Sequence, residues 1–132
     1  MSNVRFVDMQ PVGKLPEVLA AADIHLVPLK RGLARSSVPS KTYSVLAAGR
    51  PIVASVDRGS EVARVLERTG AGIAVPPEDA ESFTKAVRKL IESPDEAKAM
   101  GAAGRAFVET WASPAAIAEA YEHLFEELSR RS

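Results

Sequence analysis

Short apolar segments alternate with helix-like segments over the first part of the chain. Apolar residues run continuously or alternate at 4–7, 24–28, 51–55 and 73–75, a pattern that predicts short strands. Between them, residues 15–22, 40–48 and 61–68 are predicted to be helical, with Gly49 and Gly70 placed to end the second and third helices. Strands that alternate with helices over short connections are typical of a parallel sheet. The pattern therefore predicts an α/β fold with a sheet of about four strands and flanking helices.

The chain after residue 79 is predicted to be helical throughout. Residues 80–92 have helical spacing, and Pro94 and Pro114 open the two helices that follow, as suits proline in a first turn. Gly101 and Gly104 lie inside the helical pattern, where each glycine costs about 1 kcal/mol relative to alanine, so close helix packing is expected there. With no linker and no internal repeat, residues 1–132 are predicted to form one domain, a Rossmann-like unit with a helical C-terminal tail.

Composition and charge exclude several classes of function. The chain has 17 basic and 17 acidic residues, and this balance argues against general nucleic-acid binding. It has no cysteine, so no disulfide, thiol nucleophile or cysteine metal site is available within it. His25 and His123 lack metal-ligand spacing, and no metal site is predicted. No segment resembles a signal peptide or is long enough to cross a bilayer, so a cytoplasmic location is expected.

Candidate chemistry concentrates in the loop and helix start at residues 35–44. Ligands of parallel sheets bind beyond the carboxyl ends of the strands, and this loop follows the predicted strand at 24–28. The first amides of a helix are unpaired and partly positive, so they favour phosphate groups, and Lys41 adds a full charge there. Ser40 is the expected N-cap. The predicted diphosphate site comprises Arg35, Ser36, Ser37, Ser40 and Lys41.

The alternative for this segment is a helix start without a ligand, because serine, lysine and proline are common at such positions. Neither a Gly-x-x-x-x-Gly-Lys-Ser motif nor a Gly-x-Gly-x-x-Gly motif is present. The residues alone leave both interpretations open.

Several segments, taken in order, resemble the C-terminal half of family 4 retaining glycosyltransferases of the GT-B fold. The run from Ala47 through Gly49 and Pro51 to Ala54 is similar to the end of the family's donor-binding helix and its following strand. The other similar segments are 4–7 with 15–28, 38–46, 59–62, 70–79 and 100–111. The resemblance implies binding of a nucleotide-diphosphate sugar and transfer of the glycosyl group to an acceptor with retention. It implies neither a metal ion nor another cofactor.

The resemblance also implies positions for the donor contacts. The family has a pair of glutamates, the first meeting the donor sugar and the second the ribose. Aligned on the Ala47-Ala48-Gly49 segment, these positions hold Ser36 and Ser44, so both carboxylates are replaced. Glu61 matches a further loop near the donor. Met9 and Gln10 follow the first predicted strand, where either a nucleotide base or a plain turn is expected.

The family's enzymes have an N-terminal acceptor domain and two earlier strands, and this chain is expected to be truncated after both. Alone it is expected not to transfer sugar. Two other classes stay open: a non-catalytic nucleotide-sensing or interaction module, which the two serines favour, and a nucleotide-sugar epimerase of the same fold. Self-association through an exposed sheet edge is a further open prediction. Contact of Arg130 and Arg131 with anionic lipid at the inner membrane face is another.

Overall fold

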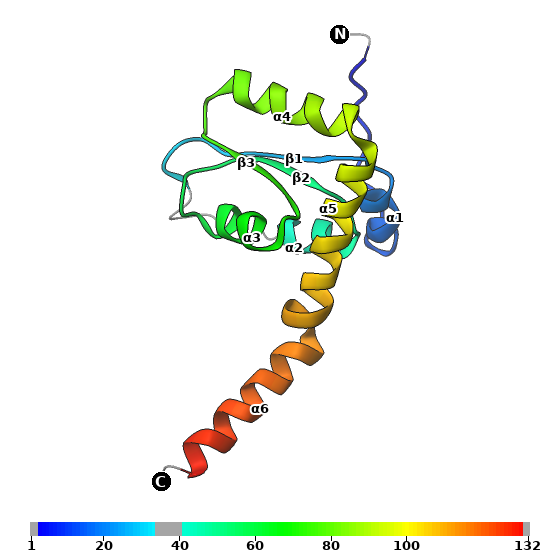
Figure 1. The fold of residues 1–132 in the computed structure, drawn as a ribbon. Helices are drawn as coiled ribbons and strands as arrows, with labels where there is room; N and C mark the ends of the chain where they lie inside the picture. Colours follow the sequence, from blue (N-terminus) through cyan, green and yellow to red (C-terminus); the bar gives the residue numbers. More distant parts are fainter. Residues whose placement is uncertain (1–2, 34–40, 131–132) are drawn as a thin grey trace.

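A parallel sheet with the strand order β1-β2-β3 forms the centre of the molecule, and helices cover both of its faces (Figure 1). The structure, a computed structural model, describes residues 3–33 and 41–130. The strands are β1 (His25–Pro28), β2 (Ile52–Ser55) and β3 (Gly72–Val75). The helices are α1 (Leu15–Ala20), α2 (Lys41–Ala47), α3 (Glu61–Thr69), α4 (Ala80–Glu92), α5 (Pro94–Phe107) and α6 (Pro114–Arg130), with a 3-10 turn at Val12–Lys14 and a π-helical turn at Val108–Ala112. The predicted α/β class is confirmed.

The middle strand, β2, is apolar along its whole length because both of its faces are covered. It pairs in parallel with β1, where Ile52 faces His25, and with β3, where Ile52 faces Gly72. All four of its residues are buried. Ile52 packs into the core on one face and Val53 into the core on the other, as the alternation of a strand requires. This is why a continuous apolar run, rather than an alternating one, indicates the central strand.

Helices α2, α3 and the end of α5 cover one face, while α4 and the start of α5 cover the other (Figure 1). On the first face, Leu46 of α2 and Leu66 of α3 are almost fully buried against β2. On the second, Leu90 of α4 and Ala97 of α5 pack against Val53. Each face thus has its own cluster of buried side chains, and α5 contributes to both.

The close packing predicted at the two α5 glycines is confirmed. A Cβ atom added to Gly101 would lie 2.1 Å from the carbonyl oxygen of Gly49, and one added to Gly104 would lie 2.7 Å from Cδ2 of Leu46. Gly49 itself has φ +70°, the left-handed conformation that ends α2. Helix α5 therefore lies directly on the turn that joins α2 to β2.

Helix α6 projects away from the rest of the molecule (Figure 1) and buries none of its residues. Large apolar side chains along it are exposed, with Tyr121 at 56% and Leu128 at 52%. Within the described residues, no helix combines the length and the apolar character that a membrane span needs.

The strand predicted at residues 4–7 is wrong. These residues are described but take no regular secondary structure, so the described sheet has one strand fewer than predicted. Phe6 is 95% exposed and Val7 68% exposed. Alternation of side chains is a local property, whereas a strand also needs a neighbour to accept its backbone hydrogen bonds, and no described strand pairs with this segment.

Candidate functional site

The turns that follow the three strands meet at one edge of the sheet, because the strands are parallel. Two contacts join them. The amide of Gly32, after β1, donates to Oδ2 of Asp57, after β2, at 2.8 Å. Nε of Arg31 lies 3.5 Å from Oε2 of Glu78, which follows β3. This carboxyl edge is therefore a connected surface, not three separate loops.

The start of α2 lies next to the start of α3 at the same edge. Lys41 is exposed there, and the Tyr43 hydroxyl donates to Oε1 of Glu61 at 3.4 Å. Burial, followed by the neighbouring Glu61 carboxylate, raises the pKa of the Tyr43 hydroxyl. Glu61 also lies 3.3 Å from Nη2 of Arg64. Ser44 is half-buried on α2. The arrangement places a cation, a hydroxyl and a carboxylate beside one helix.

Helix α3 is fixed at this edge by an N-cap at Ser60. The Ser60 hydroxyl oxygen accepts a hydrogen bond from the amide of Ala63 at 3.1 Å. Gly70, with φ +68°, ends the helix. Because Glu61 is the first residue after the cap, the position of its carboxylate follows directly from this local structure.

A cavity of about 450 Å³ opens at the carboxyl edge on the α4 side of the sheet. Its lining includes Lys30 after β1, Ser55 at the end of β2 and Phe83 of α4. Asp79 also lines it and caps α4, because its carboxylate accepts from the amide of Ser82 at 2.9 Å and from the Ser82 hydroxyl at 2.7 Å. The Ser82 backbone amide and then its hydroxyl lower the pKa of Asp79. The cavity combines charged groups of both signs with an apolar wall.

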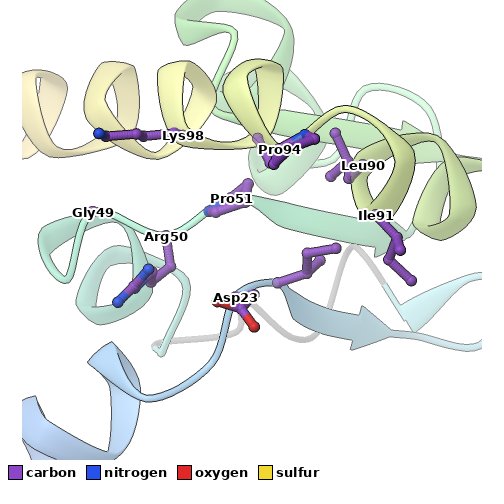
Figure 2. Close-up of a pocket in the computed structure, with 10 residues that line it drawn as sticks. Asp23, Gly49, Arg50, Pro51, Leu90, Ile91, Pro94 and Lys98 are labelled. Atoms are coloured by element: carbon purple, nitrogen blue, oxygen red, sulfur yellow. The ribbon is translucent and has the colours of Figure 1, made fainter.

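A second cavity, of about 440 Å³, lies at the opposite edge, where the strands begin (Figure 2). Arg50 of the turn after α2 and Lys98 of α5 line it from different elements, and both side chains point away from Pro51 (Figure 2). Arg50 donates to the carbonyl oxygen of Ala20, so its guanidinium ties α1 to this turn. The first turn of α5 already carries Asp95 and Glu96, which offset the positive end of that helix. Basic and acidic side chains therefore meet at this edge, as they do at the carboxyl edge.

The predicted site residues divide into three groups. Arg35, Ser36, Ser37 and Ser40 lie outside the described residues. Lys41 and Ser44 lie on α2, and the neighbouring Tyr43 of that helix bonds to Glu61 at the start of α3. Met9 and Gln10 lie away from these residues, because the segment before α1 is beside the edge where β1 begins (Figure 1). Met9 is 98% exposed, and Nε2 of Gln10 donates to the carbonyl oxygen of Asp8 at 2.9 Å. Across residues 3–33 and 41–130, no three histidine, cysteine or acidic side chains group as metal ligands would.

Sequence reasoning missed two contacts at the carboxyl edge. It assigned no role to Asp57 and no partner to the Tyr43 hydroxyl. The hydrogen bond from Gly32 to Asp57 joins residues 25 positions apart, and the one from Tyr43 to Glu61 joins residues 18 apart. The predicted parallel sheet could have indicated these contacts, because all four residues lie near the carboxyl ends of neighbouring strands.

Comparison with known proteins gives a consistent result. Residues 1–93 match the family described as Glycosyl transferases group 1. The chain is 33% identical over 91 residues to the probable glycosyltransferase WbjE of Pseudomonas aeruginosa, covering 69% of this chain and 23% of that protein. It is 32% identical over 95 residues to the putative colanic acid biosynthesis glycosyl transferase WcaI of Escherichia coli (strain K12), covering 71% and 23%. No solved structure matches significantly. The matched part thus spans about a quarter of either relative's length.

Proposed function

The chain belongs to the Glycosyl transferases group 1 family, and from this premise we propose that it is part of the donor-binding side of a retaining glycosyltransferase. The donor is a nucleotide-diphosphate sugar, whose glycosyl group passes to an acceptor. The observation that carries the proposal is the family match itself, because it extends from the segment before α1 through α4 and so includes the whole carboxyl edge of the sheet. The positions of Lys41 and Glu61 at that edge support it.

The chemistry that this edge would supply is electrostatic. As the glycosyl bond breaks, negative charge develops on the leaving diphosphate, and fixed positive groups stabilise it. Lys41 is exposed at the start of α2 and would face that charge. The loop residues Arg35, Ser36, Ser37 and Ser40 are proposed to add donors to the same phosphates. No metal ion is part of this proposal.

The sugar and ribose contacts would fall to Ser36, Ser44 and Glu61. A serine hydroxyl donates and accepts hydrogen bonds with a sugar hydroxyl but supplies no negative charge. The Glu61 carboxylate is held by Tyr43 and Arg64 beside α2 and would accept from donor hydroxyls. We therefore propose that Glu61 provides a carboxylate near the donor in a chain whose two expected glutamate positions hold serine.

Transfer itself would need more protein than this chain provides. The matched part spans about a quarter of the length of WbjE or WcaI. We expect the 132-residue chain to bind a nucleotide without transferring sugar, and the acceptor to contact another part of the complete enzyme.

Thermal unfolding of the chain with UDP, GDP or ADP tests this proposal. A nucleotide that binds only the folded state stabilises it by about 2.7 kcal/mol at roughly 100 times its Kd. We expect at least one of the three to raise the unfolding midpoint. We expect Lys41→Ala to abolish most of that rise and Lys98→Ala, an exposed lysine at the opposite edge, to leave it intact. No rise with any nucleotide, or equal loss in both variants, contradicts the proposal.

A non-catalytic nucleotide-sensing module is the second candidate, because Ser36 and Ser44 replace the expected carboxylates. The two candidates differ in the complete protein, where only a transferase consumes a nucleotide-diphosphate sugar when an acceptor is present. Conversion of the donor sugar without an acceptor would instead indicate the epimerase. Self-association through an exposed sheet edge and contact with anionic lipid stay predictions, which the apparent mass in solution and vesicle sedimentation would test.

A further inference from the structure

Five large apolar side chains lie along one side of α6, and we call them the α6 stripe: Ile117, Tyr121, Leu124, Phe125 and Leu128. At 3.6 residues per turn, these positions fall within an arc of about 100°. Each side chain is between 46% and 61% exposed. Helix α6 leads away from the body of the molecule, which comprises the sheet and α1 to α5 (Figure 1), and its main contacts are with the π-helical turn directly before it. The α6 stripe is therefore a long apolar surface that faces solvent.

The spacing of the α6 stripe is typical of a helix that packs against another helix. Four of its residues, Ile117, Tyr121, Leu124 and Leu128, follow one another at steps of four, three and four residues, which is the spacing of a heptad seam. Side chains at this spacing stay on one line when two helices wind around each other. The surface that best fits the α6 stripe is therefore another helix with a matching line of apolar side chains.

A second copy of α6 that runs in the opposite direction supplies such a line. With a two-fold axis at the middle of the stripe, Ile117 lies opposite Leu128 of the second copy, and Tyr121 lies opposite Leu124. Because α6 leads away from the body, opposite directions place the two bodies at opposite ends of the pair (Figure 1). A parallel pair would bring both bodies to the same end. The antiparallel arrangement therefore lets the two helices meet without contact between the bodies.

The residues beside the seam are also complementary in the antiparallel pair. Ala118 and Phe125 lie on one flank, and Ala120 and Glu127 lie on the other, with seven residues between the members of each pair. The same two-fold axis places Phe125 beside Ala118 of the second copy, so a large side chain meets a small one. It places Glu127 beside Ala120, so the two Glu127 carboxylates do not face each other. Both flanks therefore favour this register.

The area of the α6 stripe is sufficient for a specific dimer that forms reversibly. Half of the surface of one large apolar side chain is about 100 Å², so two stripes together would bury about 1,000 Å². This area is at the lower limit for a specific protein interface. We therefore expect the dimer to form at high protein concentration and to dissociate on dilution.

A lipid surface fits α6 less well than a second copy does. Helices that lie on membranes carry basic residues on their polar face. The polar positions of α6 include Glu119, Glu122 and Glu126, and Nη2 of Arg130 lies 3.1 Å from Oε2 of Glu126. This negative charge opposes anionic lipid, whereas in the antiparallel pair it stays in water on the outer side of the helices.

We propose that the chain forms a homodimer in which the α6 stripes of two copies pack in antiparallel orientation. Helix α6 lies outside residues 1–93, which match the family, so this interface is separate from the proposed donor site. The pairing joins α6 to α6 and adds no contact to either body. Nucleotide binding at the carboxyl edge is therefore expected to be the same in the monomer and in the dimer.

Sedimentation velocity measures the mass of the 132-residue chain between about 1 and 200 μM. We expect the mass of one chain at the lowest concentration and of two chains at the highest. Leu124→Glu places a charge in the middle of the stripe and is expected to weaken the dimer at least about tenfold. Ile91→Glu is the matched control, because Ile91 is an apolar residue of α4 that is 66% exposed, and this variant should dimerise as the wild type does. Circular dichroism checks that each variant folds.

Disulfide formation tests the antiparallel register, because the chain has no cysteine of its own. Ala120→Cys and Glu127→Cys are made separately, mixed in equal amounts at about 200 μM, and treated with glutathione disulfide. In the proposed dimer the two positions lie beside each other across the seam, whereas each is about 10 Å along the seam from its own counterpart. We expect the disulfide between the two variants to exceed either homodisulfide at least about fivefold by mass spectrometry.

Each other outcome overturns the proposal. A wild-type mass of one chain at every concentration shows that the α6 stripe does not bind a second copy. A dimer that persists in Leu124→Glu shows association through another surface, such as an exposed sheet edge. The three disulfides in their statistical proportion contradict the antiparallel register. Monomeric wild type that sediments with vesicles of phosphatidylcholine and phosphatidylglycerol, while Leu124→Glu does not, identifies lipid as the occupant instead. If Leu124→Glu does not fold, Tyr121→Gln replaces it, and a dimer of wild-type strength in that variant overturns the proposal.

Discussion

Replacing Gly101 with alanine tests how tightly α5 holds the turn after α2. The added Cβ would lie 2.1 Å from the carbonyl oxygen of Gly49, 2.8 Å from its carbonyl carbon and 3.3 Å from Cα of Arg50. All three atoms belong to the backbone, so no side-chain rotation relieves the contact. Restoring a normal separation requires a shift of roughly 1 Å between α5 and this turn.

The expected change in stability combines two opposing terms. Overpacking a tight contact costs about 1–3 kcal/mol, and contact with backbone belongs at the upper end of that range. Alanine gains about 1 kcal/mol over glycine within a helix. We therefore expect a net destabilisation of about 2 kcal/mol, which corresponds to a fall in the unfolding midpoint of roughly 5–10 °C for a domain of this size.

Urea unfolding followed by circular dichroism measures this difference. Gly13→Ala is the control, because no atom lies within 4 Å of its added Cβ, and it is expected to change stability by less than about 0.5 kcal/mol. Gly104→Ala should lose an amount of stability between those of the other two variants. The nearest atom to its added Cβ is Cδ2 of Leu46 at 2.7 Å, and this side chain can rotate away. If Gly101→Ala is as stable as the wild type, or more stable, helix propensity outweighs packing and the reasoning is refuted.

Three further predictions concern other parts of the fold. Ser60→Ala removes the N-cap bond to Ala63 and should cost about 1 kcal/mol in urea unfolding, whereas an unchanged midpoint would mean that water replaces the cap. Removing residues 114–132 should leave the unfolding midpoint nearly unchanged, because α6 buries no residue, and a large fall would show that α6 packs on the body in solution. Because the pKa of Asp79 is lowered in the folded state, its ionised carboxylate stabilises the fold at pH values above the ordinary aspartate pKa. This stabilisation is lost as the pH falls through the lowered pKa. The difference in unfolding midpoint between wild type and Asp79→Ala should therefore be largest near neutral pH and should disappear below about pH 4. A difference that does not change with pH would contradict a stabilising role of the ionised carboxylate.

The parts of the fold that the sequence predicts are those with a strong local cause. The continuous apolar run of β2 follows from burial on both faces, and the starts of α3, α5 and α6 follow from a serine cap and two prolines. The long-range packing at Gly101 can also be predicted from the local sequence. Glycine destabilises a helix, so its presence inside one indicates that a larger side chain would not fit. These features need no knowledge of the neighbouring strand.

The prediction failed where a feature depends on a partner elsewhere. Residues 4–7 have the alternation of a strand, yet pairing depends on a neighbour that the local pattern does not specify. Lys41 was predicted because helix starts have recognisable sequences, and Glu61 because of the resemblance to the family; both stay predictions as site residues. Asp57 was not found as a partner of Gly32, because only the adjacency of β1 and β2 brings these turns together.

The location of nucleotide binding on the sheet tests the central claim most directly. Amide resonances of the ¹⁵N-labelled chain are followed during titration with UDP, GDP or ADP. The account predicts that the largest displacements occur at the carboxyl edge, at Gly32, Lys41 and Glu61. Displacements confined to the cavity at the opposite edge (Figure 2), at Arg50 and Lys98, would contradict it, as would no displacement with any of the three nucleotides.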